Sequence, residues 1–458
     1  MTSVQRLSTP TRLARAAMAA GALAALPIAT AAMAQVDSDT TTQLQRFAEV
    51  FQRVKALYVE PVTDKQLIDG AISGMLSSLD PHSAYLNEFD NQNLRTQTDG
   101  KYGGLGLTVS LEDGAVKVIA PFEDSPADKA GIKAGDYITH LDKKLIIGGT
   151  LDEAVEQMRG RPGDPITLTI ARPGTDDSFD VTIVRQIVEL KAVKWEVKNG
   201  VGIINLNGFS RDATDEVSAA IAGIRGQTGG KPKGYVLDMR SNPGGLLTQA
   251  INISDLFLTK GKIVEQRGRM RGENATYYAR PGDATDGAPI VVLIDVGSAS
   301  ASEIVAGALQ DGHRALVMGE RSFGKGSVQT VFDLTPTTGL RLTTARYFTP
   351  SGRSVQEGGI KPDIPVPQLT DPNWKKRPRI READLRRHLV NEQLKDEGVI
   401  EDDLKDDPRF TMTADELKAK GIEDFQLNYA IETLARRAGS QTASAKPGQG
   451  GARKVGAR

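Results

Sequence analysis

The spacing of apolar residues changes along the chain, and the first part has the period of a helix. In residues 42–93 apolar side chains recur every three or four positions, which predicts helices with one apolar face. The turn Asp80-Pro81-His82-Ser83 interrupts this pattern. The face fits either a dimerisation surface or part of the core, and ordinary helix burial favours the core. It consists of Leu44, Phe47, Val50, Phe51, Val54 and Leu57.

Residues 103–184 have a different sequence pattern, in which short segments typical of β-strands are separated by turns that contain Gly, Asp and Pro. The runs at 105–109 and 115–119 flank Glu112-Asp113-Gly114 and predict a β-hairpin. Ser125 is placed to cap a short helix. At about 80 residues, the segment has the size of one small β-rich domain.

From Lys194 onward, apolar runs alternate with helical patterns, as in an α/β domain. The run at 289–294 is the strongest buried strand in the chain. It leads into Gly297-Ser298-Ala299-Ser300, and a helix is expected from there through Gln310.

Beyond Asp371 the chain is charged, and we expect it to be helical. Residues 417–437 have the pattern of a last amphipathic helix. From Gly439 to the end, small, polar and basic residues predict a disordered tail.

Composition narrows the function classes. The chain has 458 residues, enough for two to four domains, and a net charge of −1, so no global basic field exists to bind nucleic acid. It contains no cysteine, which excludes a thiol nucleophile, disulfides, Cys-ligated zinc and iron–sulfur clusters. Its four histidines leave little material for a His-rich metal site.

The N-terminus has the pattern of an export signal. Three arginines and no acidic residue precede Asp37, and an Ala-rich apolar stretch follows at residues 16–33. The stretch ends in Ala32-Met33-Ala34, a small-x-small cleavage pattern. The alternative is an uncleaved membrane anchor, but alanine is a weak membrane residue and Pro27 interrupts the run. We therefore expect cleavage after residue 34 and a bacterial periplasmic location, with membrane association as the alternative.

The small residues at 297–302 are the first candidate for chemistry. A serine between a strand and a helix start can expose its hydroxyl beside backbone N–H groups that stabilise an oxyanion. The alternative is that Ser298, Ser300 or Ser302 only caps the helix.

The second candidate is the glycine-rich segment 319–326. It nearly fits the phosphate-binding pattern G-x-x-x-x-G-K-[ST], but Gly326 stands where Ser or Thr must hold magnesium. The segment that follows has a strand pattern rather than a helix pattern, which also argues against a nucleotide-binding loop.

A serine nucleophile needs a base, and no histidine has a convincing setting. A lysine can serve if burial lowers its pKa from about 10.4 to roughly 7–8. Phe323 and the surrounding glycines fit such a pocket for Lys325.

Several motifs, taken together and in order, resemble the carboxyl-terminal processing peptidases, the tail-specific protease family. The resemblance covers nearly the whole mature chain to about residue 370. The motifs lie at residues 80–86, 102–107, 237–245, 298–304, 319–329, 349–354 and 359–364.

By this resemblance Ser300 is the nucleophile, Lys325 the general base and Gln329 the residue that orients the lysine. If Lys325 opens a strand, Gln329 lies four residues on and on the same face. The N–H of Ala301 and the N–H of a glycine would form the oxyanion hole. The sequence does not decide whether this glycine is Gly244 or Gly245.

Residues 99–185 resemble a PDZ domain, whose loop binds a substrate's terminal carboxylate through backbone N–H groups. The alternative is a glycine-rich hairpin without this role. Ile138 would join Leu105 and Leu107 in lining the pocket for the last side chain. The expected loop consists of Gly103, Gly104, Leu105, Gly106 and Leu107.

The expected fold is an α/β protease core with a mixed sheet of crotonase/Clp type, an inserted PDZ domain and helical N- and C-terminal regions. Its parts are a signal peptide (1–34), an N-terminal helical region (35–98), the PDZ domain (99–185), the peptidase core (186–370), a C-terminal helical region (371–438) and a disordered basic tail (439–458).

The function that follows from the resemblance is an exported serine endopeptidase that binds free apolar C-termini of proteins and cleaves through an acyl-enzyme. No metal or organic cofactor and no nucleic acid is implied. One alternative is a PDZ scaffold on an inactive core, but the joint presence of Ser300, Lys325 and Gln329 argues against it. The other alternative is a P-loop ATPase. The substrate, the oligomeric state, the role of an adaptor lipoprotein and that of the tail stay open.

Overall fold

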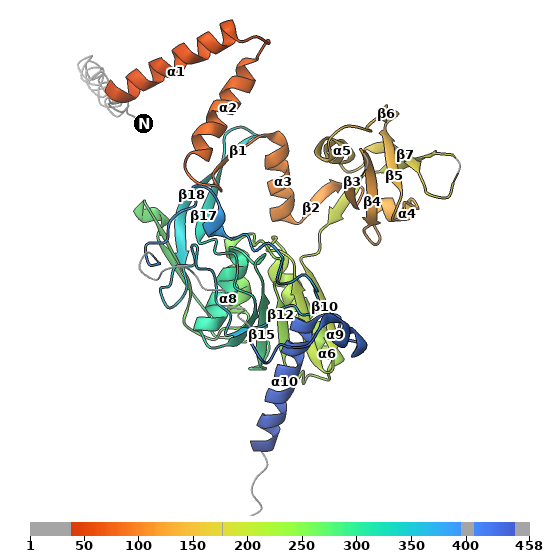
Figure 1. Cartoon of the computed structure of the whole chain (residues 1–458), viewed down its shortest axis with the longest axis vertical. Helices are drawn as coiled ribbons and strands as arrows, with labels where there is room; N and C mark the ends of the chain where they lie inside the picture. The colour runs from red at the N-terminus through yellow and green to blue at the C-terminus, as the bar shows by residue number, and fades with distance from the viewer. Residues whose placement is uncertain (1–37, 113, 176, 395–406, 445–458) are drawn as a thin grey trace, which may run out of the picture. The chain divides into compact units, whose positions relative to one another are not determined.

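The computed structural model describes residues 38–112, 114–175, 177–394 and 407–444 (Figure 1). The expected signal peptide and residues 445–458 of the expected tail lie outside this part. The chain divides into two units, residues 1–72 and 73–458, and each is described by itself. Within the described residues, no helix combines the length and apolar character that a membrane span requires.

The helical pattern of the N-terminal region corresponds to α1 (Ser38–Leu57) and α2 (Asp64–Ser77). Pro61 lies between them and cannot continue a helix. The apolar face of α1 is exposed, with Leu44 and Val50 more than half accessible. The expectation that this face belongs to the core is therefore wrong.

The second unit begins within α2 and continues through a strand that the sequence pattern did not predict. The turn at residues 80–83 leads into β1 (Ala84–Leu86), and α3 (Glu88–Asp99) follows. β1 pairs antiparallel with β18 (Gly339–Phe348), Ala84 opposite Arg341. Three residues are too few to show a strand period, and the pairing is made by residues distant in sequence.

Next comes the β-rich domain, defined here as residues 101–189. The predicted hairpin is present as β3 (Leu107–Glu112) and β4 (Ala115–Pro121), and Ser125 caps the short helix α4 as expected. Alternate residues of the strand at Pro165–Ala171, such as Ile166 and Leu168, are buried in the core. The other elements are β2 (Lys101–Gly104), α4 (Pro126–Lys129), β5 (Tyr137–Leu141), β6 (Lys144–Leu145), α5 (Leu151–Met158), β7 (Pro165–Ala171), β8 (Phe179–Val184) and β9 (Gln186–Glu189).

The α/β domain, defined here as residues 193–369, is built on a six-stranded sheet in the order β10-β11-β12-β15-β16-β19. The pair β10–β11 is antiparallel and the other pairs are parallel. Parallel neighbours need crossover connections, which contain α6, α7 and α8. The bounds are β10 (Val193–Lys198), β11 (Val201–Leu206), α6 (Ala213–Gln227), β12 (Tyr235–Asp238), α7 (Leu247–Asp255), β15 (Ile290–Ile294), α8 (Ala301–Asp311), β16 (Ala315–Gly319) and β19 (Ile364–Pro365).

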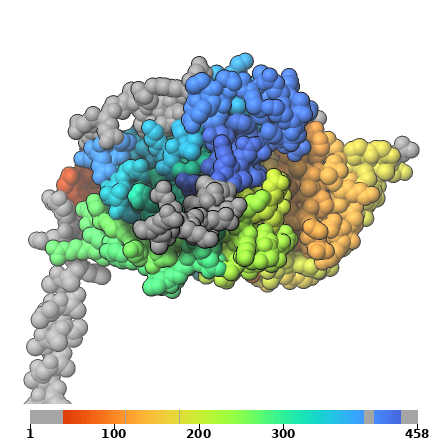
Figure 2. Space-filling model, turned by 90° about the horizontal axis from the view of Figure 1, so that it is seen from below, coloured from red at the N-terminus to blue at the C-terminus, as the bar shows by residue number. Residues whose placement is uncertain are grey.

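Both faces of this sheet are covered, which explains why an inner strand such as β15 is continuously apolar. On one face Val292 packs into the cluster that contains residues of α6, α7 and α8. On the other face Val291 packs with residues of α9 (Ala414–Ala419) and α10 (Phe425–Ser444). Figure 2 shows the blue C-terminal residues directly against yellow-green residues of the α/β domain.

A second sheet continues from the glycine-rich segment. It runs in the order β1-β18-β13-β14, with β17 also paired to β18. The register of β17 on β18 shifts between Val328 and Gln329. Its remaining elements are β13 (Lys262–Gly268), the 3₁₀ helix η1 (Arg271–Glu273), β14 (Ala275–Tyr278) and β17 (Ser327–Asp333).

The C-terminal region departs from the expected helices. Residues 371–394 form turns and the short 3₁₀ helix η2 (Glu382–Asp384), because prolines and the lack of apolar periodicity do not support longer helices. The expected helix at 417–437 is two helices, since Gly421 has a φ of +71° between α9 and α10. α10 continues through Ser444 and so includes residues assigned to the tail, because glycine and serine weaken a helix without ending it.

Candidate active site

Ser300 lies at the junction of strand β15 and helix α8, as expected. Its backbone has φ +55° and ψ −112°, and the helix begins at the next residue. A positive φ costs a residue with a side chain about 1–3 kcal/mol, and such strain gathers at functional sites. The neighbouring serines have other roles, because the buried Ser298 hydroxyl donates to Met239 O and the buried Ser302 hydroxyl to Asn242 O.

The carboxylate of Glu303 joins the serine turn to the glycine-rich loop. Its Oε2 accepts the backbone N–H of Ser300 at 2.7 Å and that of Lys325 at 3.0 Å. Its Oε1 accepts the Ser322 hydroxyl at 2.6 Å and the Gly324 N–H at 2.7 Å. The side chain is fully buried, and this burial raises the pKa of Glu303 to about 7 even though the four donors lower it.

Lys325 has the environment that a neutral lysine requires. Burial lowers its pKa, and the nearby Arg341 guanidinium lowers it further. The carboxylates of Glu382, Glu303 and Asp80 act in the opposite direction. A lysine with a lowered pKa can accept a proton from a hydroxyl near neutral pH.

The structure brings the backbones of Ser300 and Lys325 together through Glu303, but not their side chains. No hydrogen bond joins Ser300 Oγ to Lys325 Nζ among the described residues. Within the described residues Gln329 makes no hydrogen bond with the lysine; its Nε2 donates to Ser327 Oγ at 3.0 Å and to Thr343 Oγ1 at 3.3 Å. β17 begins at Ser327, as the strand pattern after residue 326 predicts, so the condition that Lys325 opens a strand is not met.

The two candidate glycines of the oxyanion hole differ in their hydrogen bonds. Gly244, with φ +102°, lies so close that an added Cβ would be 2.9 Å from Ala301 N. Its own N–H donates to Asn242 Oδ1 at 2.9 Å. The N–H groups of Gly245 and Ala301 make no hydrogen bond within the described chain. The geometry therefore favours Gly245 with Ala301 as the donor pair, and Gly244 as the residue that lets the two segments approach.

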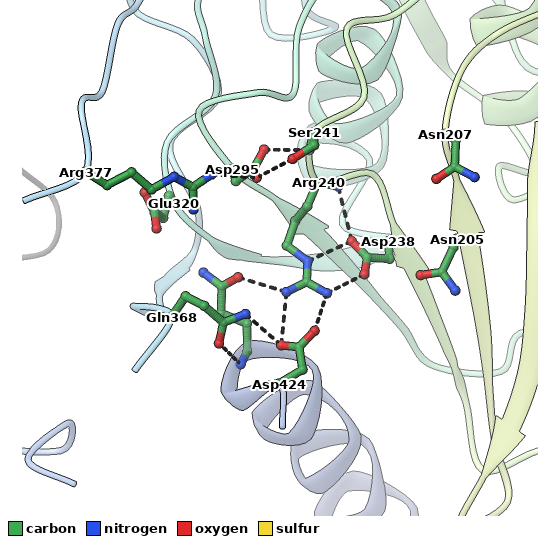
Figure 3. Close-up of a pocket in the computed structure, with 11 residues that line it drawn as sticks. Asn205, Asn207, Asp238, Arg240, Ser241, Asp295, Glu320, Gln368, Arg377 and Asp424 are labelled. Atoms are coloured by element: carbon green, nitrogen blue, oxygen red, sulfur yellow. Dashed lines mark hydrogen bonds and ion pairs between the residues drawn. The ribbon is translucent and has the colours of Figure 1, made fainter. Parts of the chain in front are cut away.

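The loop that carries these glycines is held from below by a charged network (Figure 3). The Arg240 guanidinium lies between Asp238 at 2.5 Å and Asp424 at 2.7 Å. Ser241 N–H donates to Asp295 Oδ1 at 2.7 Å, which joins this loop to the end of β15. These side chains line a polar cavity of about 260 Å³ at the carboxyl ends of the parallel strands.

Sequence reasoning assigned no role to Glu303 or Asp424. A signal for Glu303 was present, since a glutamate three residues after a serine at a helix start is a capping-box pattern. Nothing local marks Asp424, because its partner is Arg240, 184 residues away.

The β-rich domain has a groove of about 170 Å³ between its glycine loop and α5. Leu105, Gly106 and Leu107 line it, as expected. Gly103 and Gly104 instead lie in β2, which pairs with β9. Ile138, expected at the pocket, is fully buried in the domain core. The groove therefore uses the second half of the expected loop, opposite side chains such as those of Val155 and Met158.

Two other kinds of site were considered. The segment 319–326 is followed by strand β17 and not by a helix, so the nucleotide-binding alternative is wrong. The described residues contain no group of three His, Asp or Glu side chains that could hold a metal ion.

Known protein families match three parts of the chain. The model of peptidase family S41 matches residues 200–366, the α/β domain. The model of the PDZ domain matches residues 103–183, the β-rich domain. The model of the activating protease CtpB N-terminal domain matches residues 18–89.

Curated relatives match over most of their length. The carboxy-terminal-processing protease of Bartonella bacilliformis is 50% identical over 79% of this chain and 84% of its own. The carboxy-terminal processing protease CtpA of Bacillus subtilis is 34% identical over 70% of this chain and 69% of its own. Among solved structures, the photosystem II D1 C-terminal processing protease is similar at 29% identity, with a TM-score of 0.42 over 70% of this chain and 92% of that one. The chain therefore belongs to peptidase family S41 and is a carboxy-terminal processing serine protease with a PDZ domain.

Proposed function

We propose that this S41 peptidase is an exported endopeptidase that binds the free C-terminus of a protein in its PDZ groove and cleaves the chain with Ser300 and Lys325. The observation that carries the proposal is the shared carboxylate of Glu303, which accepts backbone N–H groups of both residues. A strained serine at a helix start and a buried lysine are thereby fixed to one group.

The reaction would begin when neutral Lys325 takes the proton of Ser300 Oγ as this oxygen attacks the peptide carbonyl. The N–H groups of Ala301 and Gly245 would stabilise the negative oxygen of the tetrahedral intermediate. The lysine ammonium then returns the proton to the leaving amine, and an acyl-enzyme remains on Ser300. Water, activated by the same lysine, hydrolyses it.

The side chains must move before this reaction can start. Ser300 Oγ and Lys325 Nζ are not hydrogen-bonded in the described arrangement of the site. We therefore infer that this arrangement is a resting state of the enzyme. Gln329 would leave Ser327 and Thr343 to orient the lysine in the active state. In this proposal, substrate binding favours the active arrangement by population shift.

Substrates with apolar free C-termini fit the PDZ groove. Its walls include Leu107, Val109 and Val155, which suit an apolar last side chain. A peptide would add as a strand beside β3, with its carboxylate at the N–H groups of the loop.

Export and partners complete the proposal. Residues 1–34 have the sequence pattern of a cleaved signal, which supports a periplasmic location. The exposed apolar face of α1 supports self-association through a second copy. The proposal that an adaptor lipoprotein is a partner rests on the family resemblance alone.

The test is cleavage of an unstructured reporter with an apolar free C-terminus by purified residues 35–458 at pH 6–10. We expect cleavage to require the free carboxylate, Ser300 and Lys325, and to increase with pH as the lysine becomes neutral. Controls are a C-terminally amidated reporter, Ser300→Ala and Lys325→Ala. Full cleavage by Ser300→Ala would contradict the assignment.

A further inference from the structure

The turn Asp80-Pro81-His82-Ser83 has no role in the function described so far, yet it is tightly organised. Asp80 Oδ1 accepts the N–H groups of His82 and Ser83, both at 2.9 Å. Asp80 Oδ2 accepts the Ser83 hydroxyl at 2.7 Å. The turn is therefore a rigid unit that holds the histidine side chain in one direction.

The turn is fixed to the sheet that follows Lys325. Thr343 on β18 donates its hydroxyl to Asp80 Oδ1 at 3.1 Å, and its N–H to Ser83 Oγ at 3.1 Å. The same Thr343 hydroxyl accepts Gln329 Nε2. Arg341 Nε donates to His82 O at 2.9 Å. The turn thus contacts the strand that pairs with β17.

His82 reaches from this turn to a second segment. Its Nε2 lies 2.8 Å from Oε2 and 3.0 Å from Oε1 of Glu382, whose side chain is only 1% exposed. Glu382 comes 300 residues later and lies outside the part of the chain that the S41 family model matches. A buried carboxylate needs such a partner, because an unpaired charge is costly inside a protein.

Glu382 in turn holds the loop on both sides of Lys325, at Phe323 directly and at Gly326 through Gln356. Its backbone N–H donates to Phe323 O at 3.1 Å. Its Oε1 accepts Gln356 Nε2 at 3.0 Å, and Gln356 Oε1 accepts the N–H of Gly326 at 3.0 Å. The loop around the lysine is therefore fixed on one side by Glu303 and on the other by Glu382.

We propose that His82 is a positioning residue for the reaction: by joining the Asp80–Ser83 turn to Glu382, it completes a clamp that holds the backbone of the loop that carries Lys325. The clamp consists of Asp80, His82, Gln356 and Glu382. The inference rests on the proposed role of Lys325 as the base.

The clamp also sets the charge around the lysine. The groups that act on its pKa are Arg341 on β18, Glu382 on η2, Glu303 on α8 and Asp80 in the turn. Glu382→Gln removes one negative charge, so the lysine should lose its proton at lower pH. His82→Ala takes away the imidazole Nε2 that lies 2.8 Å from the Glu382 carboxylate, so this hydrogen bond no longer draws on its negative charge and the lysine should lose its proton at higher pH.

The experiment measures the rate at which a small fluorophosphonate labels Ser300, and kcat and KM for the free C-terminal reporter, from pH 5.5 to 10. For His82→Ala we expect kcat to fall about 10- to 100-fold, with KM and PDZ peptide binding unchanged. We expect the pH midpoint of labelling to increase in His82→Ala and to decrease in Glu382→Gln. His82→Gln, which can still donate an N–H to Glu382, should recover most of the rate.

Two controls separate this inference from simpler explanations. His313→Asn changes an exposed histidine in a left-handed turn that asparagine tolerates, and it should change nothing. Thermal unfolding shows whether each variant is folded. A purely structural role would reduce stability without opposite shifts of the two midpoints.

The outcomes also separate this inference from the proposed function. If Lys325→Ala is inactive and the folded variants at His82 and Glu382 keep the wild-type kcat and midpoint, the clamp is wrong and the proposed function stands. If Lys325→Ala cleaves normally, the proposed function fails and the clamp fails with it.

Discussion

At the scale of single residues, the site depends on side chains that do not touch the substrate. Glu303 fixes the backbones of the serine and the lysine, and Asn242 plays a similar part for the glycine loop. Asn242 accepts the Gly244 N–H on its side chain and donates its amide to Leu206 O at 2.7 Å. Hydrogen-bonded buried groups of this kind fix a unique geometry, because leaving one donor unpaired is costly.

The first prediction concerns Glu303→Gln. Glutamine has the same size, but its amide nitrogen would face N–H donors in place of an accepting oxygen. We expect kcat to fall about 100-fold and the free energy of unfolding to decrease by about 1–3 kcal/mol. Steady-state kinetics and thermal unfolding check this. A variant with wild-type kcat would show that the shared carboxylate does not position the dyad.

The second prediction concerns pH and the same side chain. Because burial raises the pKa of Glu303 from 4.5 to about 7, the folded chain binds this proton more tightly than the unfolded chain. Its contribution to the free energy of unfolding is therefore full below about pH 4.5 and is lost as pH rises to about 7. Activity should show the opposite trend, since protonated Glu303 must give up one accepted hydrogen bond.

The measurement is kcat/KM and thermal unfolding between pH 4.5 and 9. We expect the activity of the wild type to fall as pH decreases through about 7, because Glu303 becomes protonated. In Glu303→Gln this decrease should be absent, and only the pH dependence caused by protonation of Lys325 should remain. An unchanged acidic limb in the variant would assign it to another group.

Local pattern was sufficient to place Ser300 at a helix start and Lys325 in a glycine-rich loop with an apolar neighbour. The local pattern did not predict which side chains hold these two residues in place. His82 and Glu382 are 300 residues apart, and no periodicity connects two residues that meet only after folding. A strand period could not relate Gln329 to Lys325, because β17 begins only at Ser327 and its register on β18 shifts between Val328 and Gln329.

At the scale of elements, long apolar strands were predictable and short or interrupted elements were not. β15 is buried on both faces, and this appears directly as an unbroken apolar run. β1 has three residues and is stabilised by its partner β18, so its own sequence carries little signal. The division between α9 and α10 depends on one glycine in a left-handed conformation.

The third prediction tests whether α10 and its preceding turn support the oxyanion loop. Asp424→Asn removes one of the two carboxylates on Arg240 and weakens the support of the loop below Gly244. We expect the free energy of unfolding to decrease by about 1.5–3 kcal/mol and kcat to fall, with KM unchanged. Denaturant unfolding and kinetics measure this.

Asp415→Asn is the matched control, because Asp415 belongs to the same C-terminal region and is exposed. It should leave both quantities unchanged. Loss of stability in Asp424→Asn without any loss of kcat in the folded variant would mean that the network serves only to attach α10.

At the scale of the whole molecule, the groove of the PDZ domain and the site around Ser300 lie in different domains. The order of the domains could be predicted from the sequence, because the spacing of apolar residues changes at the domain boundaries. The way in which the parts are joined was not visible, since β1 pairs with β18 and Glu382 of η2 donates to Phe323 O, and these two elements lie on either side of the α/β domain in the sequence.

The fourth prediction separates the two domains. Val155→Glu places a charge in the apolar groove of the PDZ domain. We expect kcat/KM for the free C-terminal reporter to fall to the value for the amidated reporter, because the groove no longer binds an apolar terminus. Labelling of Ser300 by the small fluorophosphonate should stay at the wild-type rate. Continued preference for the free carboxylate would place C-terminal recognition elsewhere.

The pairing of His82 with Glu382 also has a consequence for how the enzyme is made. A chain is synthesised from its N-terminus at about 5–20 residues per second, so the histidine waits about 15–60 s for its partner. Once Lys325 itself has been made, its loop lacks one of its two supports until Glu382 follows. A chain that ends before residue 382 therefore cannot form the clamp, and its Lys325 loop would be held by Glu303 alone.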